Sequence, residues 1–574
     1  MKLETIRHSL SHIMAWAVKE LYPDAKFGIG PAIENGFYYD FKFKKPLSPE
    51  DLPKIENKMK ELLKEKVSFT KKEISKPEAK KLFKGQPYKL ELIKEMKGKI
   101  STYKSGGFID LCKGPHVRNS SEIPKDSFKL TKIAGAYWKG DEKNQMLTRI
   151  YAIAFNSKSE LDKFLKMQKE AEKRDHRFLG EKLELFLIDE EFGKGLILWQ
   201  PKGAILRRKV MDFALNTYLK RGYLLAATPH IANLDLWKKS GHWDFYRENM
   251  YSPMKVEQES FMIKPMNCPG HVKIYSSKMR SYKDLPLRLT EMGTVYRFER
   301  SGVLHGLTRV RGFTQDDAHI FCTPEQLHSE LIEMIDLTKY ILDSFGFKEF
   351  EISLSVQDPK QKKKYLGSDK MWKIAESSLE YALKEKKLDY KRYLGEAVFY
   401  GPKIDFLVED AIGRKWQLTT IQVDFNFPEK FDLTYIDNKG KKKRPIMLHR
   451  ALLGSLERFI GVLIEHYGGD FPLWLAPEQI WVVPVGSRHK KYAKEIGKKL
   501  FEKEFRIEVK DEAETVSKKI REGEIQKIPY ILVVGDKEEK QNQVRVRQRK
   551  KGDIGIMKFK KFVEIAEKEV KDKK

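Results

Sequence analysis

Apolar and polar positions alternate with different periods along the chain, and the changes of period divide it into four segments. From about Ala476, short apolar runs (IWVVPV, FRIEVKD, YILVVGD) alternate with charged stretches of helical length. This alternation predicts a small α/β domain with a largely parallel sheet over 474–574. Residues 155–177 are charged, lack glycine and proline, and predict one linking helix. We expect separate domains from residues 1–154, which mix helical and strand patterns, and from residues 178–473, a long α/β segment with repeated glycine and proline.

The first segment begins with a helical pattern that carries two histidines. Ile6, Leu10, Met14, Ala17 and Leu21 recur at helical spacing and predict an apolar stripe. At about 100° per residue, His8 and His12 project nearly opposite that stripe, and Trp16 near their face favours a cleft over open solvent. Cys112 and His116, again four apart, supply a second pair. Together the four side chains offer the nitrogen and sulfur ligands of a tetrahedral metal site, although surface histidines with no such role are equally compatible with this spacing.

Composition narrows the class of protein. The chain has 574 residues and a formal net charge of +29, which favours a polyanionic partner, with nucleic acid first. A lysine-rich surface adapted to heat is the alternative, but basic runs such as 441–444 contain few acids. Three cysteines predict a reducing, cytoplasmic setting without a disulfide framework. No apolar run approaches the roughly 20 residues that a membrane span needs, so no membrane association is expected.

The segment from Arg297 to Phe321 carries the most specific chemistry. Arg297-Phe298-Glu299-Arg300 is followed by a glycine-bearing loop and by Thr308-Arg309-Val310-Arg311-Gly312-Phe313. The alternation predicts two antiparallel strands with a mobile loop, on which arginines spaced by two share one face. Fixed guanidinium groups suit a polyphosphate because each can hold two oxygens, whereas an ordinary basic hairpin would show the same local pattern.

This segment resembles motif 2 of the class II aminoacyl-tRNA synthetases, and Gln315-Asp316-Asp317-Ala318-His319 is similar to the threonyl-tRNA synthetase form in particular. The resemblance implies a catalytic domain built on an antiparallel sheet, in which Arg297 holds the α-phosphate and the substrate carboxylate. Glu299 would bind the adenine amino group, and Arg309 and Arg458 would grip the far phosphates. It assigns catalysis to Arg297, Lys403 and Arg458, and ATP binding to Arg297, Glu299, Arg309, Gln422, Gly454 and Arg458.

The other two class II motifs are weaker when taken alone. A helix from Ile205 to Arg221 and a strand ending at Pro229 resemble motif 1, which implies a homodimer. MLHRALLGSLERFIGVLIEHYGG resembles motif 3, a strand followed by a helix. Gly454 and Arg458 are four apart and are expected to share one helix face, where the missing side chain lets a flat base approach. A helix whose arginine points to water is the alternative.

Cys268, His319 and His449 are far apart in sequence and show no common spacing. Taken alone, each is expected to be a packed or solvated residue. The resemblance to threonyl-tRNA synthetases implies that these three hold a catalytic zinc ion with a position left open for substrate. An apolar pocket would separate threonine from valine only weakly, by roughly a hundredfold, whereas an open zinc can take both the amino group and the hydroxyl. Serine makes both contacts too, so a second, hydrolytic site becomes necessary. The resemblance places the following residues around the threonine: Gln315, Asp317, as acceptor for its hydroxyl, Tyr400 and Gln417.

The segments GFIDLCKGPHV and TKIAGAYWKGD resemble the editing domain that threonyl- and alanyl-tRNA synthetases share. The resemblance implies an amino-terminal α+β editing domain that hydrolyses seryl-tRNA with water, assisted by Lys89 and Asp110. In the alanyl branch the equivalent positions hold zinc, and in the threonyl branch they act without it, so a metal in this cleft stays open. The cleft is assigned to His8, His12, Lys89, Asp110, Cys112 and His116.

The last segment resembles the anticodon-binding domain of class IIa synthetases through KIREGEIQKIPYILVVGDKE. Arg545, Arg547 and Arg549 alternate with other residues and are expected on one strand face, where a solvated edge strand is the alternative. Unpaired anticodon bases are readable by stacking and by edge hydrogen bonds, and we expect Glu538 and Arg547 to contact them.

Taken over the whole chain, the resemblance implies a threonine–tRNA ligase whose partners are threonine, ATP with Mg²⁺, and tRNA specific for threonine. Many bacterial members begin with a ubiquitin-like domain, and this sequence has no segment that resembles it. We expect activation to be unaffected and editing or tRNA handling to be weaker. A synthetase-like RNA-binding or regulatory protein without aminoacylation, and a prolyl- or seryl-type synthetase, are the rival interpretations.

Overall fold

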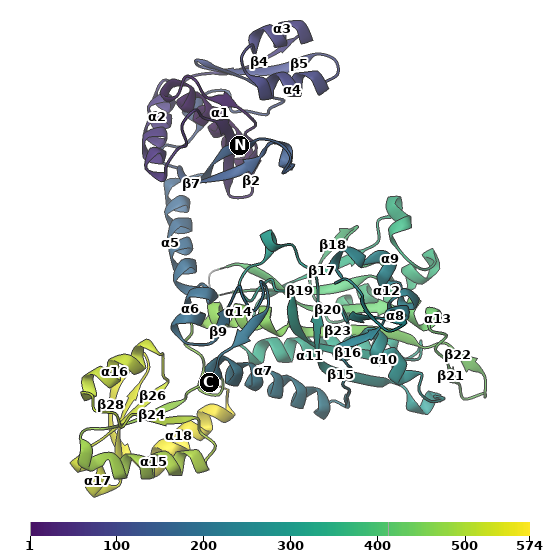
Figure 1. Cartoon of the computed structure of the whole chain (residues 1–574), viewed down its shortest axis with the longest axis vertical. Helices are drawn as coiled ribbons and strands as arrows, with labels where there is room; N and C mark the ends of the chain where they lie inside the picture. The colour runs from purple at the N-terminus through teal and green to yellow at the C-terminus, as the bar shows by residue number, and fades with distance from the viewer. Residues whose placement is uncertain (1, 411–412, 574) are drawn as a thin grey trace. The chain divides into compact units, whose positions relative to one another are not determined.

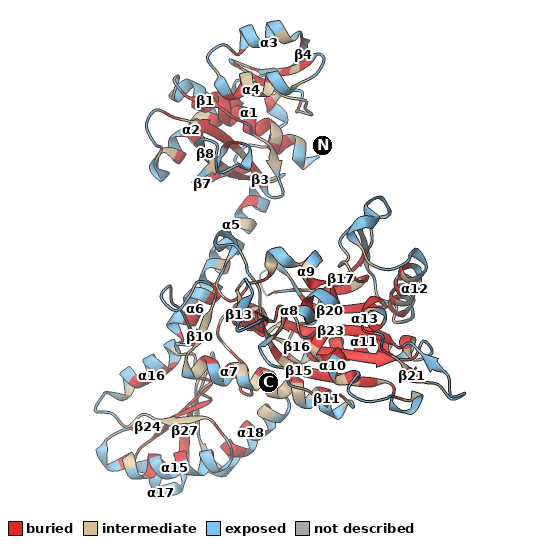
Figure 2. Ribbon diagram, turned by 45° about the vertical axis from the view of Figure 1, so that its right-hand side comes forward, coloured by how far each residue is buried: buried red, intermediate tan, exposed pale blue. Residues whose placement is uncertain are grey.

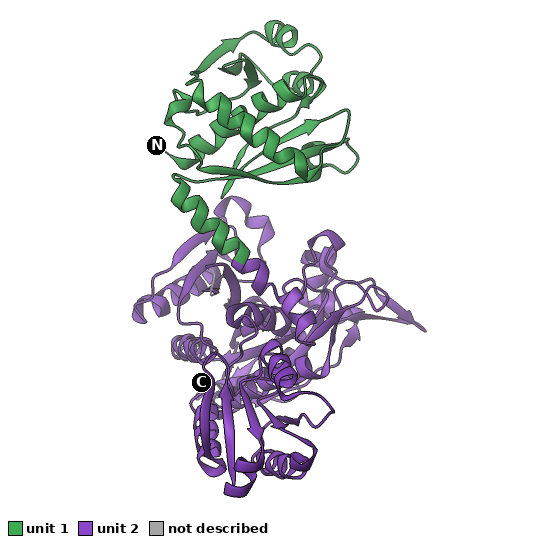
Figure 3. Ribbon diagram, turned by 90° about the vertical axis from the view of Figure 1, so that its left-hand side faces the viewer, with its two compact units in different colours: residues 1–169 green, residues 170–574 purple. Residues whose placement is uncertain are grey.

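The computed structural model describes residues 2–410 and 413–573. Its contacts divide the chain into two compact units, Met1–Lys169 and Glu170–Lys574 (Figure 3). The division falls inside helix α5 (Lys158–Arg174), which ends at Arg174 instead of running on to 177. Asp175 accepts the amide hydrogen of Arg177 and thereby starts a separate helix, α6 (His176–Lys182).

Unit 1 is an α+β domain with two antiparallel sheets. Helix α1 (Leu3–Leu21) packs against α2 (Leu52–Lys64) and against the larger sheet. A smaller helical pair, α3 (Lys76–Leu82) and α4 (Pro87–Glu95), accompanies the second sheet. The larger sheet has the order β1-β3-β8-β7 with β2 on β3, and comprises β1 (Lys26–Phe27), β2 (Ala32–Ile33), β3 (Gly36–Lys42), β7 (Phe128–Tyr137) and β8 (Met146–Ala154). The smaller sheet comprises β4 (Phe69–Ile74), β5 (Ile100–Ser105) and β6 (Phe108–Leu111).

Helix α1 is enclosed on all sides, which the predicted single apolar stripe did not anticipate. Every residue from Ile6 to Val18 is buried except His8, which is partly exposed. His12, expected opposite the apolar stripe, is only 2% exposed, whereas Leu21, placed in the stripe, is 40% exposed. The helix lies between α2 and strands of both sheets, so its polar face is covered as well as its apolar one.

The larger part of unit 2 is built on an eight-stranded sheet (Figure 1). Its two outermost pairs are parallel and all inner pairs antiparallel. In spatial order the strands are β11 (Leu224–Leu225), β15 (Leu287–Tyr296), β16 (Gly312–Cys322), β23 (Ile446–Ser455), β20 (Lys415–Asp424), β19 (Lys403–Glu409), β17 (Phe350–Val356) and β18 (Lys391–Leu394).

Long helices bury one face of this sheet in the largest core of the molecule, and every residue of the central strand β23 except Ser455 is buried (Figure 2). Shorter elements pack on the opposite face around a smaller core. The helices of the first face are α7 (Pro201–Lys220), α11 (Leu327–Ser344), α12 (Asp369–Glu385) and α14 (Leu456–Tyr467). The opposite face carries α8 (Leu234–Ser240), α10 (Cys268–Tyr275) and α13 (Asn426–Lys430), beside a small sheet of β12 (Ile231–Asn233), β14 (Glu259–Ile263) and β13 (Met254–Val256).

The carboxy-terminal domain is an α/β sandwich, as predicted, but its sheet is only partly parallel. The strand order is β25-β24-β26-β27-β28. The β25–β24 and β24–β26 pairs are parallel, and the β26–β27 and β27–β28 pairs are antiparallel. The strands are β24 (Ile480–Pro484), β25 (Ile507–Val509), β26 (Tyr530–Val534), β27 (Gln543–Gln548) and β28 (Gly552–Lys558). The helices are α15 (Lys490–Glu502), α16 (Val516–Ile525), α17 (Asp536–Gln541) and α18 (Phe559–Lys571). Among the described residues, no helix combines the length and apolar composition that a bilayer span requires.

Candidate functional site

The alternation of side chains along β16 sorts structural residues from functional ones. Ala318, Ile320 and Cys322 enter the helix-covered core. Asp317 and His319 therefore point to the opposite face, because successive side chains of a strand alternate. In the register of the neighbouring strand β23, His319 stands directly opposite His449.

Cys268 opens helix α10 and completes a cluster with these two histidines. The thiol sulfur and one nitrogen from each ring lie within 4.8 Å of one another, and none of the three residues is more than 6% exposed. Burial lowers the pKa of His319, which keeps its imidazole neutral, as a metal ligand requires. One thiol and two imidazoles form the soft, mixed donor set that zinc prefers when a position is left for substrate. The residues therefore fit the implied ion.

Each of these two imidazoles has a hydrogen-bond partner on one ring nitrogen. Nε2 of His449 lies 2.9 Å from Oδ2 of Asp424, whose second oxygen accepts backbone amides at the start of α13. Nδ1 of His319 lies 2.8 Å from Nδ1 of His271. Behind His271 stand Glu291 and the ammonium group of Lys264, 3.2 Å apart. Contacts of this kind orient histidine ligands around a metal.

The cluster forms one wall of a cavity of about 280 Å³. The residues predicted to surround threonine all line it, as do the three cluster residues and Arg297. Asp317 accepts a hydrogen bond from Asn267 at 3.0 Å, and burial raises its pKa. The other predicted residues that line this cavity are Gln315, Asp317, Tyr400, Lys403, Gln417 and Gln422.

A second cavity of about 190 Å³ shares Arg297, Gln315 and Gln417 with the first. Five of the residues predicted to bind ATP line it, namely Arg297, Glu299, Arg309, Gly454 and Arg458. Gln422 lies instead in the first cavity, where its side-chain oxygen accepts the hydroxyl of Tyr400 at 2.7 Å. Arg309 forms an ion pair with Glu299 at 3.1 Å.

The predicted hairpin strands of motif 2 are shorter than the alternation suggested. Strand β15 ends at Tyr296 and β16 begins at Gly312. The amide of Arg297 still bonds to the carbonyl of Arg311, but the amide of Arg311 turns away to Gly195, which ends the ladder. Arg309 and Arg311 thus lie in a loop and not on one strand face.

Gly454 also lies elsewhere than predicted. It belongs to the end of strand β23, because Ser455 caps helix α14 by accepting the amide of Arg458. Gly454 has φ +71, and a Cβ at this position would lie 2.6 Å from the carbonyl oxygen of Leu418. Glycine is therefore required by backbone conformation and by close approach, not by a shared helix face.

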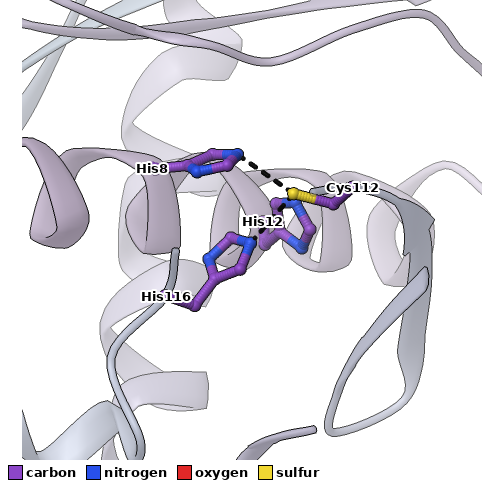
Figure 4. Close-up of side chains that lie close together, drawn as sticks. All are labelled: His8, His12, Cys112 and His116. Atoms are coloured by element: carbon purple, nitrogen blue, oxygen red, sulfur yellow. Dashed lines mark hydrogen bonds between the residues drawn. The ribbon is translucent and has the colours of Figure 1, made fainter. Parts of the chain in front are cut away.

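In unit 1 the four predicted Cys and His side chains also come together (Figure 4). The sulfur of Cys112 lies 3.3 Å from Nε2 of His8 and 3.1 Å from Nε2 of His116. Ser9 holds the other nitrogen of His116 at 3.2 Å. Burial lowers the pKa of His116 to about 2 and raises the pKa of Cys112 to about 11. Both groups are consequently uncharged near neutral pH.

Lys89 and Asp110 form an ion pair beside this cluster, and both side chains are buried. Tyr39 donates its hydroxyl to Asp110 at 2.6 Å and accepts from the Lys89 ammonium at 3.0 Å. Asp110 also lies 3.9 Å from Nε2 of His12. The structure therefore brings together all six residues that were assigned to this cleft.

The two predicted anticodon residues have different surroundings. Glu538 is 8% exposed and caps helix α17 by accepting the amide of Gly535 at 3.0 Å. Arg547 lines a cavity of about 350 Å³ and pairs with Glu524. Arg549, expected on the same strand face as Arg547, lies beyond the end of β27 and donates to the carbonyls of Phe471 and Lys527.

Several site residues escaped sequence reasoning. Asp405 orders the first cavity by accepting Gln417 at 2.8 Å and Thr420 at 2.7 Å and by pairing with Lys403. Asn267 adjoins Cys268, and Asp424 lies two residues after Gln422, so proximity in sequence was an available signal for both. The others, Tyr39, His271 and Asp405, carry no local pattern that distinguishes them.

Comparison with known proteins agrees with this geometry. Residues 251–467 match the tRNA synthetase class II core domain (G, H, P, S and T), and residues 479–569 match an anticodon binding domain. Residues 100–151 match the threonyl and alanyl tRNA synthetase second additional domain. A threonine–tRNA ligase of Dehalococcoides mccartyi is 51% identical over all of this chain and 97% of that protein. The chain belongs to the threonyl-tRNA synthetases. The threonine–tRNA ligase of Aquifex aeolicus is 50% identical over 100% of this chain and 90% of that protein. The one of Thermus thermophilus is 49% identical over 99% of this chain and 89% of that protein.

Solved structures of the family confirm the fold class. The RNA binding domain of threonyl-tRNA synthetase from Cryptosporidium parvum is 40% identical, with a TM-score of 0.66 over 69% of this chain and 98% of that one. A putative threonyl-tRNA synthetase from Aeropyrum pernix is 31% identical, with a TM-score of 0.60 over 70% of this chain and 96% of that one. The class II core, the anticodon-binding domain and the editing domain are thus all present.

Proposed function

We propose that the chain activates threonine with ATP, transfers it to tRNA specific for threonine, and hydrolyses mischarged seryl-tRNA in a separate cleft. The observation that carries this proposal is the convergence of Cys268, His319 and His449 on a cavity that adjoins an arginine-lined one. Membership in the threonyl-tRNA synthetases, with an editing domain present, favours it over a regulatory RNA-binding protein.

Cys268, His319 and His449 would hold one zinc ion in the first cavity. Such an ion supplies a Lewis acid that accepts the amino group and the hydroxyl of threonine together, which valine cannot match. The protein residues then complete the pocket. Asp317 accepts the hydroxyl proton of threonine, Asn267 holds Asp317 in place at 3.0 Å, and Tyr400 packs beside the ring of His449.

In activation, the threonine carboxylate attacks the α-phosphorus of ATP, a P–O bond forms, and the bond to pyrophosphate breaks. The carboxylate is already ionised, so no general base is needed, and catalysis depends on position and on cations. Arg297 lies where the two cavities meet and would hold both the α-phosphate and the carboxylate. Lys403, paired with Asp405, would steady the reacting groups from the first cavity.

The second cavity would hold the nucleotide, which an ATP-using class II enzyme takes with Mg²⁺. Glu299 would accept the adenine amino group, Arg309 and Arg458 would contact the far phosphates, and Gly454 would allow the base to approach the backbone. In the second step a tRNA terminal hydroxyl attacks the activated carbonyl, the ester C–O bond forms, the bond to AMP breaks, and AMP leaves with release of the hydroxyl proton. Arg547, and Glu538 from the capped end of α17, are the proposed contacts for anticodon bases.

The cleft in unit 1 would hydrolyse the seryl ester. A water molecule attacks the carbonyl carbon, the ester C–O bond breaks, and the tRNA hydroxyl leaves with a proton. Lys89 and Asp110, linked through Tyr39, would position that water. A raised thiol pKa of about 11 makes Cys112 a poor nucleophile near neutral pH, which favours water over a covalent intermediate.

A second copy of the chain would cover the motif 1 region, giving a homodimer. Strand β11 forms an edge of the eight-stranded sheet, and its Leu224 and Leu225 are 54% and 59% exposed. Ile205 and Leu219 on α7 are exposed as well. Replacing Leu224 and Leu225 by glutamate should give monomers in analytical ultracentrifugation. Leu394→Glu, which alters a 66% exposed leucine at the other edge of the sheet, should leave dimers, and dimers in both variants would refute the interface.

Amino-acid-dependent ATP–pyrophosphate exchange tests the whole assignment. Zinc-replete protein should exchange with threonine, exchange weakly with serine, and show little exchange with valine or proline. No exchange with any amino acid would favour the regulatory interpretation, and preferential exchange with proline or serine would favour a synthetase of another specificity.

A further inference from the structure

A buried histidine with both ring nitrogens engaged lies where α6 begins. His176 is completely buried. Its Nε2 lies 3.0 Å from the backbone nitrogen of Leu307, and its Nδ1 lies 2.7 Å from Oε1 of Glu465. A backbone amide can only donate, so Nε2 is the acceptor and the ring proton resides on Nδ1. His176 therefore accepts from Leu307 and donates to Glu465.

Glu465 holds the imidazole from behind. It stands in the last turn of α14 and is 2% exposed. The oxygen that accepts Nδ1 also accepts the backbone amide of His176 at 3.1 Å, and the other oxygen contacts the guanidinium of Arg414. Arg174 adds a hydrogen bond of 3.0 Å to the carbonyl of His466. The ring consequently has one orientation, fixed by the motif 3 helix.

On its other side, His176 reaches the segment that returns from the motif 2 loop. Gly306 has φ +48, and a Cβ there would lie 2.1 Å from Nε2 of His176, so only glycine permits the contact. The carbonyl of Thr308 accepts Nε of Arg458 at 2.9 Å. The segment is thus held by His176 at the amide of Leu307 and by Arg458 at the carbonyl of Thr308, directly before Arg309.

A metal ion is a poorer explanation for this cluster. Ligand atoms of Asp175, His176 and Glu465 do lie within 4.8 Å of one another. Asp175, however, is bonded through both oxygens to Arg177, at 2.7 and 3.0 Å. Nε2 of His176 is occupied by the amide of Leu307, and Nδ1 carries the proton that Glu465 accepts. The donor atoms are already used in hydrogen bonds.

We propose that His176 is a positioning residue for ATP, which fixes the Leu307–Thr308 segment so that Arg309 and Arg458 meet the nucleotide phosphates. The inference rests on the proposed roles of those two arginines. Cations held in place before the substrate arrives stabilise developing charge without a cost of reorganisation. Without His176 the amide of Leu307 would be a buried donor without its partner, and the segment would shift to satisfy it.

The test is threonine-dependent ATP–pyrophosphate exchange with the full chain. His176→Asn retains a polar group near Glu465 but is too short to accept from Leu307, whereas His176→Gln brings an amide oxygen close to the position of Nε2. We expect His176→Asn to raise KM for ATP about tenfold, the factor that corresponds to one net hydrogen bond in a protein interior, with KM for threonine unchanged. His176→Gln should recover most of this loss.

Gly306→Ala approaches the same contact from the loop and leaves His176 in place, so it serves if His176→Asn folds poorly. It should also raise KM for ATP. His466→Asn is the matched control, because this neighbouring ring packs on Phe347 at 4.6 Å between centroids. His466→Asn should lower the melting temperature about as much as His176→Asn does and should leave KM for ATP unchanged.

Wild-type KM for ATP in both His176→Asn and Gly306→Ala would overturn the inference. So would equal rises in KM for ATP and for threonine, which would indicate a general structural role. Arg309→Ala separates this inference from the proposed function. If Arg309→Ala raises KM for ATP and His176→Asn does not, only this inference fails. If Arg309→Ala has no effect, the ATP assignment fails and this inference with it.

Discussion

The two Cys/His clusters of this chain use the same residue types in different surroundings. In unit 1, Cys112 and His116 are held by a serine hydroxyl, a backbone amide and one another, and the Asp110 carboxylate near His12 is paired with Lys89. In unit 2, the two imidazoles are held from outside by Asp424 and by the His271–Glu291 pair. Outer carboxylates raise the basicity of histidine ligands and fix their orientation. The groups that hold the ligand side chains thus differ more than the ligands do, and we expect one zinc per chain, bound in unit 2.

Cys268→Ser should separate the clusters most strongly. We expect loss of bound zinc and a fall in kcat/KM for threonine activation on the order of 10³-fold, because a Lewis acid contributes several kcal/mol. Metal analysis and pyrophosphate exchange measure the two effects. Cys112→Ser, the matched change in unit 1, should keep one zinc and normal activation. Normal activation by Cys268→Ser without zinc would refute the metal assignment.

His8→Ala should affect only the other cluster. We expect hydrolysis of added seryl-tRNA to slow about a hundredfold, because a side chain positioned for proton transfer contributes a rate enhancement of about this size. Threonylation should remain intact. Seryl-tRNA should then accumulate when serine is supplied, as deacylation and charging assays would record. Unchanged clearance of seryl-tRNA would exclude His8 from the editing role.

Asp424→Asn tests the outer contacts directly. An amide oxygen can still accept the amides of Asn426 and Phe427, but the charge that supports His449 is lost. We expect zinc affinity, measured by competition with a chelator, to fall about tenfold or more. Ser9→Ala removes the corresponding outer contact of His116 and should leave zinc affinity unchanged. Equal affinities in both variants would remove the distinction drawn between the clusters.

The smallest effect concerns pH. Burial holds the pKa of His116 at about 2, below its ordinary value of 6.5, so the folded chain stays neutral where the unfolded imidazole takes up a proton. The unfolded state therefore gains protons as pH falls below 6.5, and stability decreases. His8 and His12 shift in the same direction. His116→Asn should reduce the loss of melting temperature between about pH 7.5 and about pH 5 by a few degrees in calorimetry. An identical pH dependence in variant and wild type would contradict this cause.

Spacing and the family resemblance predicted the residues of both clusters, and Lys89 and Asp110 beside the first, but not the outer contacts of the histidines in the second. Helical spacing placed His8 and His12 together, and family motifs identified Cys268, His319 and His449. Local alternation could not reveal that Gly454 ends a strand or that Arg309 and Arg311 lie in a loop, because the ladder is ended by a bond from Arg311 to Gly195. The enclosure of α1 depends likewise on packing between elements distant in sequence.

The contacts that sequence reasoning missed share one physical property. Asp424, His271, Asp405 and Tyr39 act through side chains whose partners lie on other strands or helices. Register between strands is set by the complete sheet, and it decides that His319 faces His449. These pairs join residues that are distant in sequence and meet only in the folded sheet, so no local pattern in a single sequence reveals them.

Strand β16 has a consequence for the kinds of change the gene can tolerate. Asp317 and His319 serve the cavity, while Ala318, Ile320 and Cys322 fill the helix layer. Inserting one codon ahead of Asp317 would exchange the two sets. The carboxylate and the imidazole would then point into the hydrophobic core, and the apolar side chains would point toward the substrate. Length variation among relatives should accordingly be confined to the turn near Gly302, where an added Cβ meets open space, and should spare the strand.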